Sequence, residues 1–303
     1  MTQTKKQHYV PQFLLKNFCF DNKQHLFVYD KTQNKSFSSN TQNVAQENCF
    51  YNLDTANGKI CLEETYAKLE ANVAPLITKI IQTESISWLT NDDMWNILEF
   101  IIVQFYRTPQ YINLLKHEMQ TNPEQRIEIL DKDTNNILKI IKTMDLKVDA
   151  NLAKIMAHNT LREVLNNNEL IEHFNDMDWL LFRAPNDTPF VTSDAGIAMT
   201  NHIFFGRNDI SGFELPYTKI FLPISNHLML ALWHKKNMEE HKKIITQLMI
   251  SGIPIEVSDV FKNSITGEAT NYPAKSVKEC NSLFYKTAER FIFSSFEIKP
   301  NDY

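Results

Sequence analysis

Residues 90–109 read TNDDMWNILEFIIVQFYRTP and form the most apolar helical pattern in the chain. Thr90 is a predicted N-cap, and Asp92 and Asp93 lie in the first turn, where acidic side chains interact favourably with the helix dipole. Pro109 predicts a break at the other end, because proline has no amide hydrogen and restricts the residue before it. We therefore expect a buried helix around which neighbouring segments pack.

Helical periodicity continues on both sides of this stretch. Apolar residues recur every three or four positions from Leu62 to Ile80. Further helical patterns follow at roughly 110–120, 124–144 and 149–173. Residues 60–173 are therefore predicted to form an almost uninterrupted helical block.

Strand patterns lie before and after this block. The predicted strands cover residues 26–30, 35–37, 179–183, 190–193, 219–224, 227–233 and 290–296, and helices are expected near 235–250 and 274–289. Residues 41–57 are predicted to be irregular. We expect an α+β fold, predominantly helical, in which the central helical block packs on one small, mostly antiparallel sheet. The chain is predicted to be a single domain covering residues 1–303.

Composition excludes several classes of protein. The net charge is -5 with no basic half, so it does not support a nucleic-acid partner. The longest apolar stretch, around residues 97–105, is too short to span a bilayer, so no membrane association is expected. The four cysteines make no CxxC pair and suit a reducing compartment, which predicts a cytoplasmic protein. Only 6 glycines occur, and neither glycine-rich nucleotide-binding motif is present.

Several segments, in their order along the chain, resemble the domain-of-unknown-function family 4238. They are QHYVPQFLLKNF (7–18), LFVYDK (26–31), NCFY (48–51), LEETYAKLE (62–70), QFYRTP (104–109), WLLFRAP and FVTSD (179–194), FLPIS (221–225) and NSLFYKTAERFIFSS (281–295). The family signature is an N-terminal His-x-x-Pro, here His8 to Pro11. The resemblance implies one domain and brings no activity with it. The family's Ser-Asp is usually followed by a small polar residue and proline, whereas Asp194 is followed by Ala195-Gly196.

Two polar residues interrupt the most apolar helix. Gln104 and Arg107 are three positions apart, on the same side, and buried polar groups must find partners or destabilise the fold. The planar guanidinium of Arg107 suits a carboxylate or a phosphate, which makes both residues candidates for binding substrate. The alternative is a structural pair in which Arg107 meets Glu70 and holds two helices together.

Five further residues are candidates for chemistry. His8 could act as acid, base or metal ligand, or it could anchor a terminal arm. Glu63 and Glu70 lie on one helix face, with Glu70 as the better catalytic candidate, although charged helix residues are mostly solvated. Asp194 and Ser193 end a predicted strand, where Asp194 could be a base or metal ligand and Ser193 a donor to substrate. The alternative for both is a turn that closes the strand.

These residues favour a hydrolase whose catalytic groups are His8, Glu70 and Asp194, with Gln104, Arg107 and Ser193 binding a phosphate-containing substrate. A nuclease-like or nucleotide-cleaving effector of host defence, using a divalent metal ion, is the concrete form. One alternative is metal-free cleavage of a glycosidic bond in a nucleotide or in NAD. Another is a non-enzymatic binding or regulatory module in which these residues form a structural network. The sequence does not predict an oligomeric state.

Overall fold

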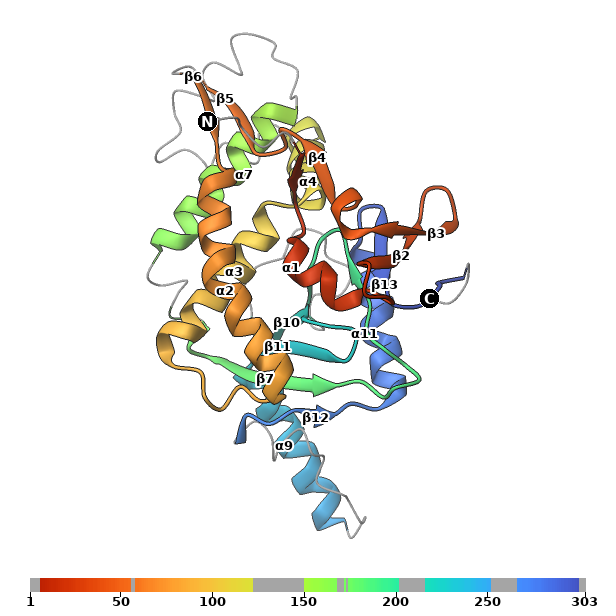
Figure 1. Cartoon of the computed structure of the whole chain (residues 1–303). Helices are drawn as coiled ribbons and strands as arrows, with labels where there is room; N and C mark the ends of the chain where they lie inside the picture. Colours follow the sequence, from red (N-terminus) through yellow and green to blue (C-terminus); the bar gives the residue numbers. More distant parts are fainter. Residues whose placement is uncertain are drawn as a thin grey trace.

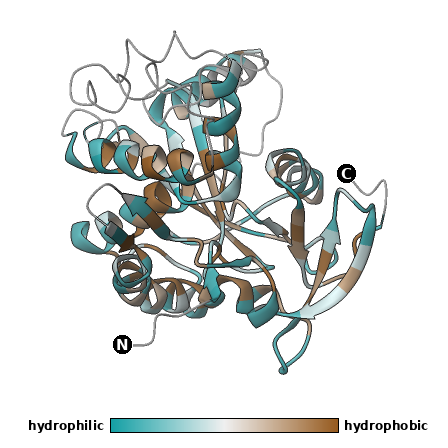
Figure 2. Ribbon diagram, turned by 90° about the horizontal axis from the view of Figure 1, so that it is seen from above, coloured by the Kyte–Doolittle hydropathy of each residue, from teal (hydrophilic) through white to brown (hydrophobic). Residues whose placement is uncertain are grey.

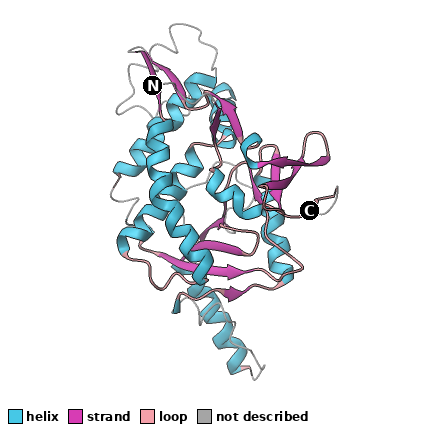
Figure 3. Cartoon of the chain, viewed as in Figure 1, coloured by secondary structure: helices cyan, strands magenta, loops and turns pink. Residues whose placement is uncertain are grey.

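The computed structural model describes residues 6–55, 58–121, 150–167, 172, 174–201, 216–251 and 266–299. Figure 1 shows α2, α3 and α7 gathered on one side of a five-stranded sheet, while α9 extends away from the body of the molecule. A second, smaller sheet lies beside α11, and Figure 3 marks both sheets among the helices. The predicted helix at 124–144 lies outside the described residues.

The helices of the described residues have the following bounds. They are α1 (Gln12–Leu15), α2 (Glu63–Thr83), α3 (Asn91–Tyr106), α4 (Pro109–Thr121), α7 (Ala150–Asn166), α9 (Lys235–Ile250) and α11 (Ala274–Thr287), with short 3-10 turns at Lys16–Phe18 and Thr41–Asn43. The predicted helices at 62–80, 90–107, 110–120, 235–250 and 274–289 are confirmed. The last helical pattern of the block, predicted over 149–173, is present as α7 up to Asn166, and Glu172 is helical as well.

The strands are short. They are β1 (Lys6–His8), β2 (His25–Asp30), β3 (Lys35–Asn40), β4 (Gln46–Asn48), β5 (Asn52–Thr55), β6 (Gly58–Cys61), β7 (Met177–Arg183), β8 (Thr192–Ser193), β9 (Ala198–Asn201), β10 (Thr218–Pro223), β11 (Leu228–His234), β12 (Thr270–Asn271) and β13 (Phe291–Ser294). All the predicted strands are present. The prediction that residues 41–57 are irregular is wrong, because β4 pairs with β1 and β5 pairs with β6.

Helix α3 begins and ends as the sequence predicts. Thr90 Oγ1 accepts from the backbone N–H of Asp93 at 3.2 Å, and the Asp93 carboxylate accepts from the backbone N–H of Thr90 at 3.0 Å. This reciprocal capping box satisfies two amides that a helix start otherwise leaves unpaired. At the other end the helix stops at Tyr106, and Pro109 starts α4. The chain turns at Arg107 and Thr108, which we call the α3–α4 junction.

The strands form more than one sheet, so the single predicted sheet is wrong. The five-stranded sheet has the order β12-β7-β11-β10-β9 and the four-stranded sheet has the order β3-β2-β13-β8. Both are antiparallel apart from the parallel β12–β7 pair. The PNDTP turn lies between β7 and β8, which belong to different sheets. Strand β7 has β12 on one edge and β11 on the other, whereas β8 pairs with β13. In the second sheet β2 pairs with β13 from Asp30↔Phe291 to Phe27↔Ser294.

The five-stranded sheet is covered on both faces. Along β11, Leu230 and Leu232 belong to an apolar cluster that includes side chains of α2, α3 and α7. Ala231 and Trp233 point to the other face, into a cluster with side chains of α11. Burial on both faces explains why β11 (LMLALWH) does not alternate between apolar and polar residues. Figure 2 shows the apolar residues concentrated inside the molecule.

The α+β class is confirmed by this arrangement of helices and sheets. The predicted block at 60–173 includes residues 122–149, which lie outside the described ranges. Among the residues that the structure describes, no helix is long and apolar enough to cross a membrane.

Candidate functional site

A buried polar chain runs from α3 to α2. Gln104 Oε1 accepts from Arg107 Nε at 3.0 Å and from Arg107 Nη2 at 2.7 Å. Arg107 Nη1 donates to Glu70 Oε1 at 2.7 Å, with 0% of the Arg107 side chain and 26% of the Glu70 side chain exposed. The pair that the sequence offered as the structural alternative for Arg107 is therefore present. It joins α3 to α2.

The amide of Gln104 extends this chain to two backbone segments. Its Nε2 donates to the carbonyl of Tyr9 at 2.8 Å and to the carbonyl of Ala195 at 3.1 Å. Gly196 has a φ of +73°, and a Cβ there would lie 2.9 Å from Gln104 Nε2. Glycine is needed at this position on both counts, since a side chain would be strained and would push Gln104 aside. Gly196, the second residue of the departure from the family pattern, thus has a backbone conformation and surroundings that favour glycine.

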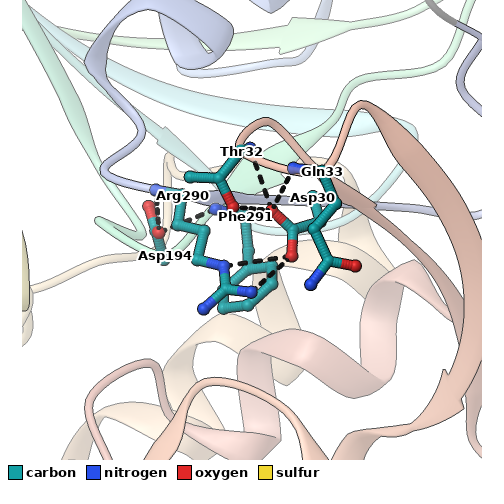
Figure 4. Close-up of polar contacts among 6 residues, drawn as sticks. All are labelled: Asp30, Thr32, Gln33, Asp194, Arg290 and Phe291. Carbon is teal, nitrogen blue, oxygen red and sulfur yellow. Dashed lines mark hydrogen bonds and ion pairs between the residues drawn. The ribbon is translucent and has the colours of Figure 1, made fainter.

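Asp194 holds the loop between α11 and β13. Its carboxylate accepts from the backbone N–H groups of Glu289 at 3.0 Å, Arg290 at 2.6 Å and Phe291 at 2.8 Å, as Figure 4 shows in part. Burial raises the pKa of Asp194, while these backbone donors lower it. The three bonds occupy the carboxylate, so its present arrangement is that of a structural clamp.

Asp30 clamps the same loop from β2. Its Oδ2 accepts from Arg290 Nε at 3.0 Å and Nη2 at 2.6 Å, and its Oδ1 accepts from the hydroxyl and backbone of Thr32. The Arg290 hydrogen bonds hold the pKa of Asp30 well below its usual range. Figure 4 shows Asp30, at the end of β2, and Asp194, just after β8, approaching the segment that contains Arg290 and Phe291.

Ser193 and His8 have local partners of their own. Ser193 is fully buried, and its Oγ accepts from the backbone N–H of Ala195 at 3.3 Å, which is the turn that the sequence offered as its alternative. The His8 ring lies 3.3 Å from the amide of Gln12, and its backbone carbonyl accepts from Tyr51 Oη at 2.9 Å. Burial lowers the pKa of His8.

Arg107 also lines a small cavity, which we call the cationic recess. Its volume is about 20 Å³, room for about one water molecule. The recess is lined by Phe50, Tyr51, Leu53, Leu62, Tyr66, Tyr106, Arg107, Ile112, Lys154, Ala157, His158 and Leu161. Residues from α2, α3, α4, α7 and the segment before β5 therefore meet there. Three of the side chains can carry positive charge.

Hydrogen-bonding capacity is left over in the recess. A guanidinium has five N–H groups, and the bonds to Gln104 and Glu70 use three of those on Arg107 within the described part of the chain. Among the same residues, the buried Nδ1 of His158 has no hydrogen-bond partner. Burial lowers the pKa of His158 and of Lys154, so the imidazole is largely neutral at pH 7. Lys154 Nζ lies 4.7 Å from the centroid of the Phe50 ring.

Two carboxylates stand close to Arg107 in different environments. Glu70 bonds to the guanidinium directly. Burial raises the pKa of Glu63, the charge of Glu70 raises it further, and Arg107 opposes both effects. No group of three or more histidine, cysteine, aspartate or glutamate side chains that could hold a metal ion occurs among the described residues.

Glu70, Gln104 and Arg107 were all candidates from the sequence, and hydrogen bonds join them in the structure. It does not bring the side chains of His8, Ser193 or Asp194 to the lining of the recess. Sequence reasoning missed Lys154 and His158. Their spacing of four residues on a helical pattern places both on one face, which was the available signal.

The molecule is thus an α+β protein with a buried Glu–Arg–Gln chain beside a cation-lined recess. The family model described as "Protein of unknown function (DUF4238)" matches residues 6–297, and the chain belongs to this family. No curated protein and no solved structure matches the chain.

Proposed function

We propose that the protein is a hydrolase that binds a phosphate-bearing substrate of the nucleotide class at the cationic recess. The observation that carries the proposal is the buried guanidinium of Arg107, with two N–H groups left over, next to Lys154 and His158. Donors of this kind in a site shielded from water favour an anion strongly. The recess has room for about one water molecule and holds the attacking water, while the phosphate group binds at its edge beside these donors.

The proposed reaction uses groups around the recess. A water molecule gives a proton to the neutral Nδ1 of His158 while its oxygen bonds to phosphorus. The ester bond breaks, and its leaving oxygen takes a proton from the carboxyl group of Glu63, whose pKa is raised by burial and by the charge of Glu70. Arg107 and Lys154 balance the negative charge that develops on the phosphate. Glu70 is a positioning residue, because it holds the guanidinium in place.

The remaining candidates receive structural roles in this proposal. Asp194 and Ser193 are bonded to backbone amides, so catalysis by either would first break those contacts. His8 contributes its backbone carbonyl to Tyr51, which lines the recess. The substrate is a small nucleotide or dinucleotide and not long DNA or RNA, because a net charge of -5 gives no broad attraction to a polyanion.

The same carboxylates fit a metal-free alternative. Glu63 as an acid and Glu70 as a charged neighbour suit cleavage of the glycosidic bond of a nucleotide, with Arg107 still holding the phosphate. A second candidate function is a binding or regulatory module without catalysis. It is favoured by the saturation of Gln104 and Asp194, whose described bonds join the N-terminal arm, α3 and the α11–β13 loop.

A substrate panel tests the proposal. The purified chain is incubated with and without Mg²⁺ or Mn²⁺ on mononucleotides, dinucleotides, NAD, DNA and RNA, and products are separated by chromatography. We expect turnover of a mononucleotide or dinucleotide that falls at least 100-fold in His158→Gln and in Glu63→Gln. Lys68→Ala is the control, because Lys68 is an exposed residue of α2. Turnover that survives both substitutions contradicts the mechanism, and release of a free base identifies the glycosidic alternative.

The absence of turnover separates the second candidate from the first. A binding module would show saturable binding of a nucleotide, weakened by Lys154→Ala, without any product. If no member of the panel is either turned over or bound, the phosphate proposal is overturned.

A further inference from the structure

A second cavity borders the α3–α4 junction, and we call it the neutral pocket. Its volume is about 330 Å³, within the range of small-molecule sites. It is lined by Phe105, Thr108, Gln110, Tyr111, Leu114, Ala195, Ile197, Ala198, Met199 and Thr287. The pocket therefore lies between the start of α4, the end of α11 and the segment that follows Asp194. It shares no lining residue with the cationic recess.

None of the residues that line the neutral pocket carries a charge. An ionic ligand would lose its hydration on entering without gaining a counter-charge, which is costly. The occupant that fits is therefore uncharged. The volume is sufficient for a ring system of nucleobase size together with a short substituent.

The walls favour a flat ring. Phe105 and Tyr111 both line the pocket, and their ring centroids are 5.3 Å apart. Aromatic side chains hold a planar ligand by stacking or edge contacts and lose little conformational freedom in doing so. Met199, Leu114 and Ile197 add apolar contacts that adapt to the ligand's outline.

The hydrogen-bonding groups that line the neutral pocket determine which donors and acceptors the ligand needs. Thr287 Oγ1 donates to the carbonyl of Leu283 at 2.9 Å, and Thr108 Oγ1 donates to the carbonyl of Phe105 at 3.1 Å. The hydroxyl hydrogen of Thr287 is thus used within α11, and that of Thr108 at the α3–α4 junction, where Thr108 Oγ1 also accepts from the backbone N–H of Tyr111 at 3.4 Å. Each hydroxyl oxygen has a lone pair left with which to accept from a ligand. The amide of Gln110 makes no side-chain hydrogen bond among the described residues and supplies one more acceptor and a donor. The ligand edge should therefore carry N–H donors.

We propose that the neutral pocket binds an uncharged planar ring of nucleobase size that bears amino or amide N–H donors. This site is independent of the cationic recess. A negative result for one proposal does not contradict the other, because no residue that lines one cavity lines the other.

The test uses adenine and nicotinamide as probes, with binding followed by ligand-observed NMR and calorimetry on the full chain. The expected result is saturable binding of at least one probe, weakened at least 10-fold by Met199→Trp, which fills the pocket. Met94→Trp is the matched control, because Met94 is also half-buried but lies near the start of α3, whereas the pocket is at the end of that helix. Benzoate, a planar anion of similar size, should bind at least 10-fold more weakly than the better probe.

A second variant protects the test against a failure of Met199→Trp to fold. Gln110→Ala lies in the first turn of α4 and removes only the amide, so a 3- to 10-fold loss of affinity is expected. Three outcomes overturn the proposal. They are no binding of either probe to the wild type, binding that both variants retain in full, and benzoate binding as tight as that of the neutral probes.

Discussion

The cationic recess and the neutral pocket meet the same α3–α4 junction and differ in every property that selects a ligand. The recess holds about 20 Å³, is lined by Arg107, Lys154 and His158, and retains unused hydrogen-bonding groups. The neutral pocket holds about 330 Å³ and has no charged lining residue. Consecutive residues supply the two linings, with Tyr106 and Arg107 in one and Phe105 and Thr108 in the other. A single break in a helix can therefore serve two kinds of chemistry.

The largest expected effect comes from removing the Arg107 guanidinium, which joins α3 to α2. Arg107→Met leaves Glu70 and Gln104 without their partner, so we expect the free energy of unfolding to fall by about 3–5 kcal/mol. Urea denaturation followed by circular dichroism measures the change. Lys154→Met is the control, because no salt bridge of Lys154 is found among the described residues, and it should cost less than about 1 kcal/mol. Equal losses in the two variants would contradict a structural role for Arg107.

The next effect tests the contact between Gln104 and the segment that lines the neutral pocket. Gly196→Ala should cost about 2–4 kcal/mol, because it adds strain at positive φ and disturbs the Gln104 bonds. Gly58→Ala is the matched control, with a φ of +114° and no atom within 4 Å of the added Cβ, and it should cost about 1–2 kcal/mol. Denaturation midpoints compare them. If Gly196→Ala is no worse than Gly58→Ala, the close approach to Gln104 contributes nothing.

A smaller effect separates the two cavities by ligand. Calorimetry with inorganic phosphate should give a 5- to 10-fold weaker affinity for Lys154→Ala than for the wild type, which is about 1–1.4 kcal/mol. Met199→Trp should leave phosphate binding unchanged, since Met199 lines only the neutral pocket. Loss of phosphate binding in Met199→Trp would show that the two cavities are not independent.

The smallest effect concerns pH. Because burial lowers the pKa of His158, the unfolded state binds a proton more readily than the folded state. The imidazole costs no stability well above pH 6.5, and stability is lost as the pH falls below that value. His158→Gln should therefore lose less stability than the wild type between pH 7.5 and pH 5.5, measured by urea denaturation. Part of the pH dependence of stability remains in His158→Gln, because burial also lowers the pKa of His8. An identical pH dependence in both proteins would refute the buried, neutral imidazole.

Local features of the sequence predicted local features of the fold. The Thr90 cap and the break at Pro109 follow from residue types at the ends of helices, whereas the pair of Arg107 with Glu70 was one of two alternatives for Arg107. The two sheets did not follow, because which strands pair depends on contacts between distant segments. Asp194 is the clearest case. Its partners are backbone amides 95 to 97 residues further along, and an amide leaves no signature in the sequence.

The candidate site was predicted in part for the same reason. Gln104 and Arg107 stood out as polar residues within an apolar helix, and Glu70 was the proposed partner. Lys154 and His158 did not stand out, since lysine and histidine on an amphipathic helix are ordinary surface residues until another element covers them. Only the packing of α7 against α3 and α4 places them beside Arg107.

The pairing of β2 with β13 has a consequence for the order in which the molecule is made. Strand β2 ends at Asp30, but its neighbour begins at Phe291. At a typical synthesis rate of about 5–20 residues per second, β13 is synthesised on the order of tens of seconds after the β2–β3 hairpin. During this interval one strand edge of the hairpin stays open to other chains. The second sheet is therefore complete only after β13 has been synthesised, and chaperones that shield strand edges should act on the chain during translation.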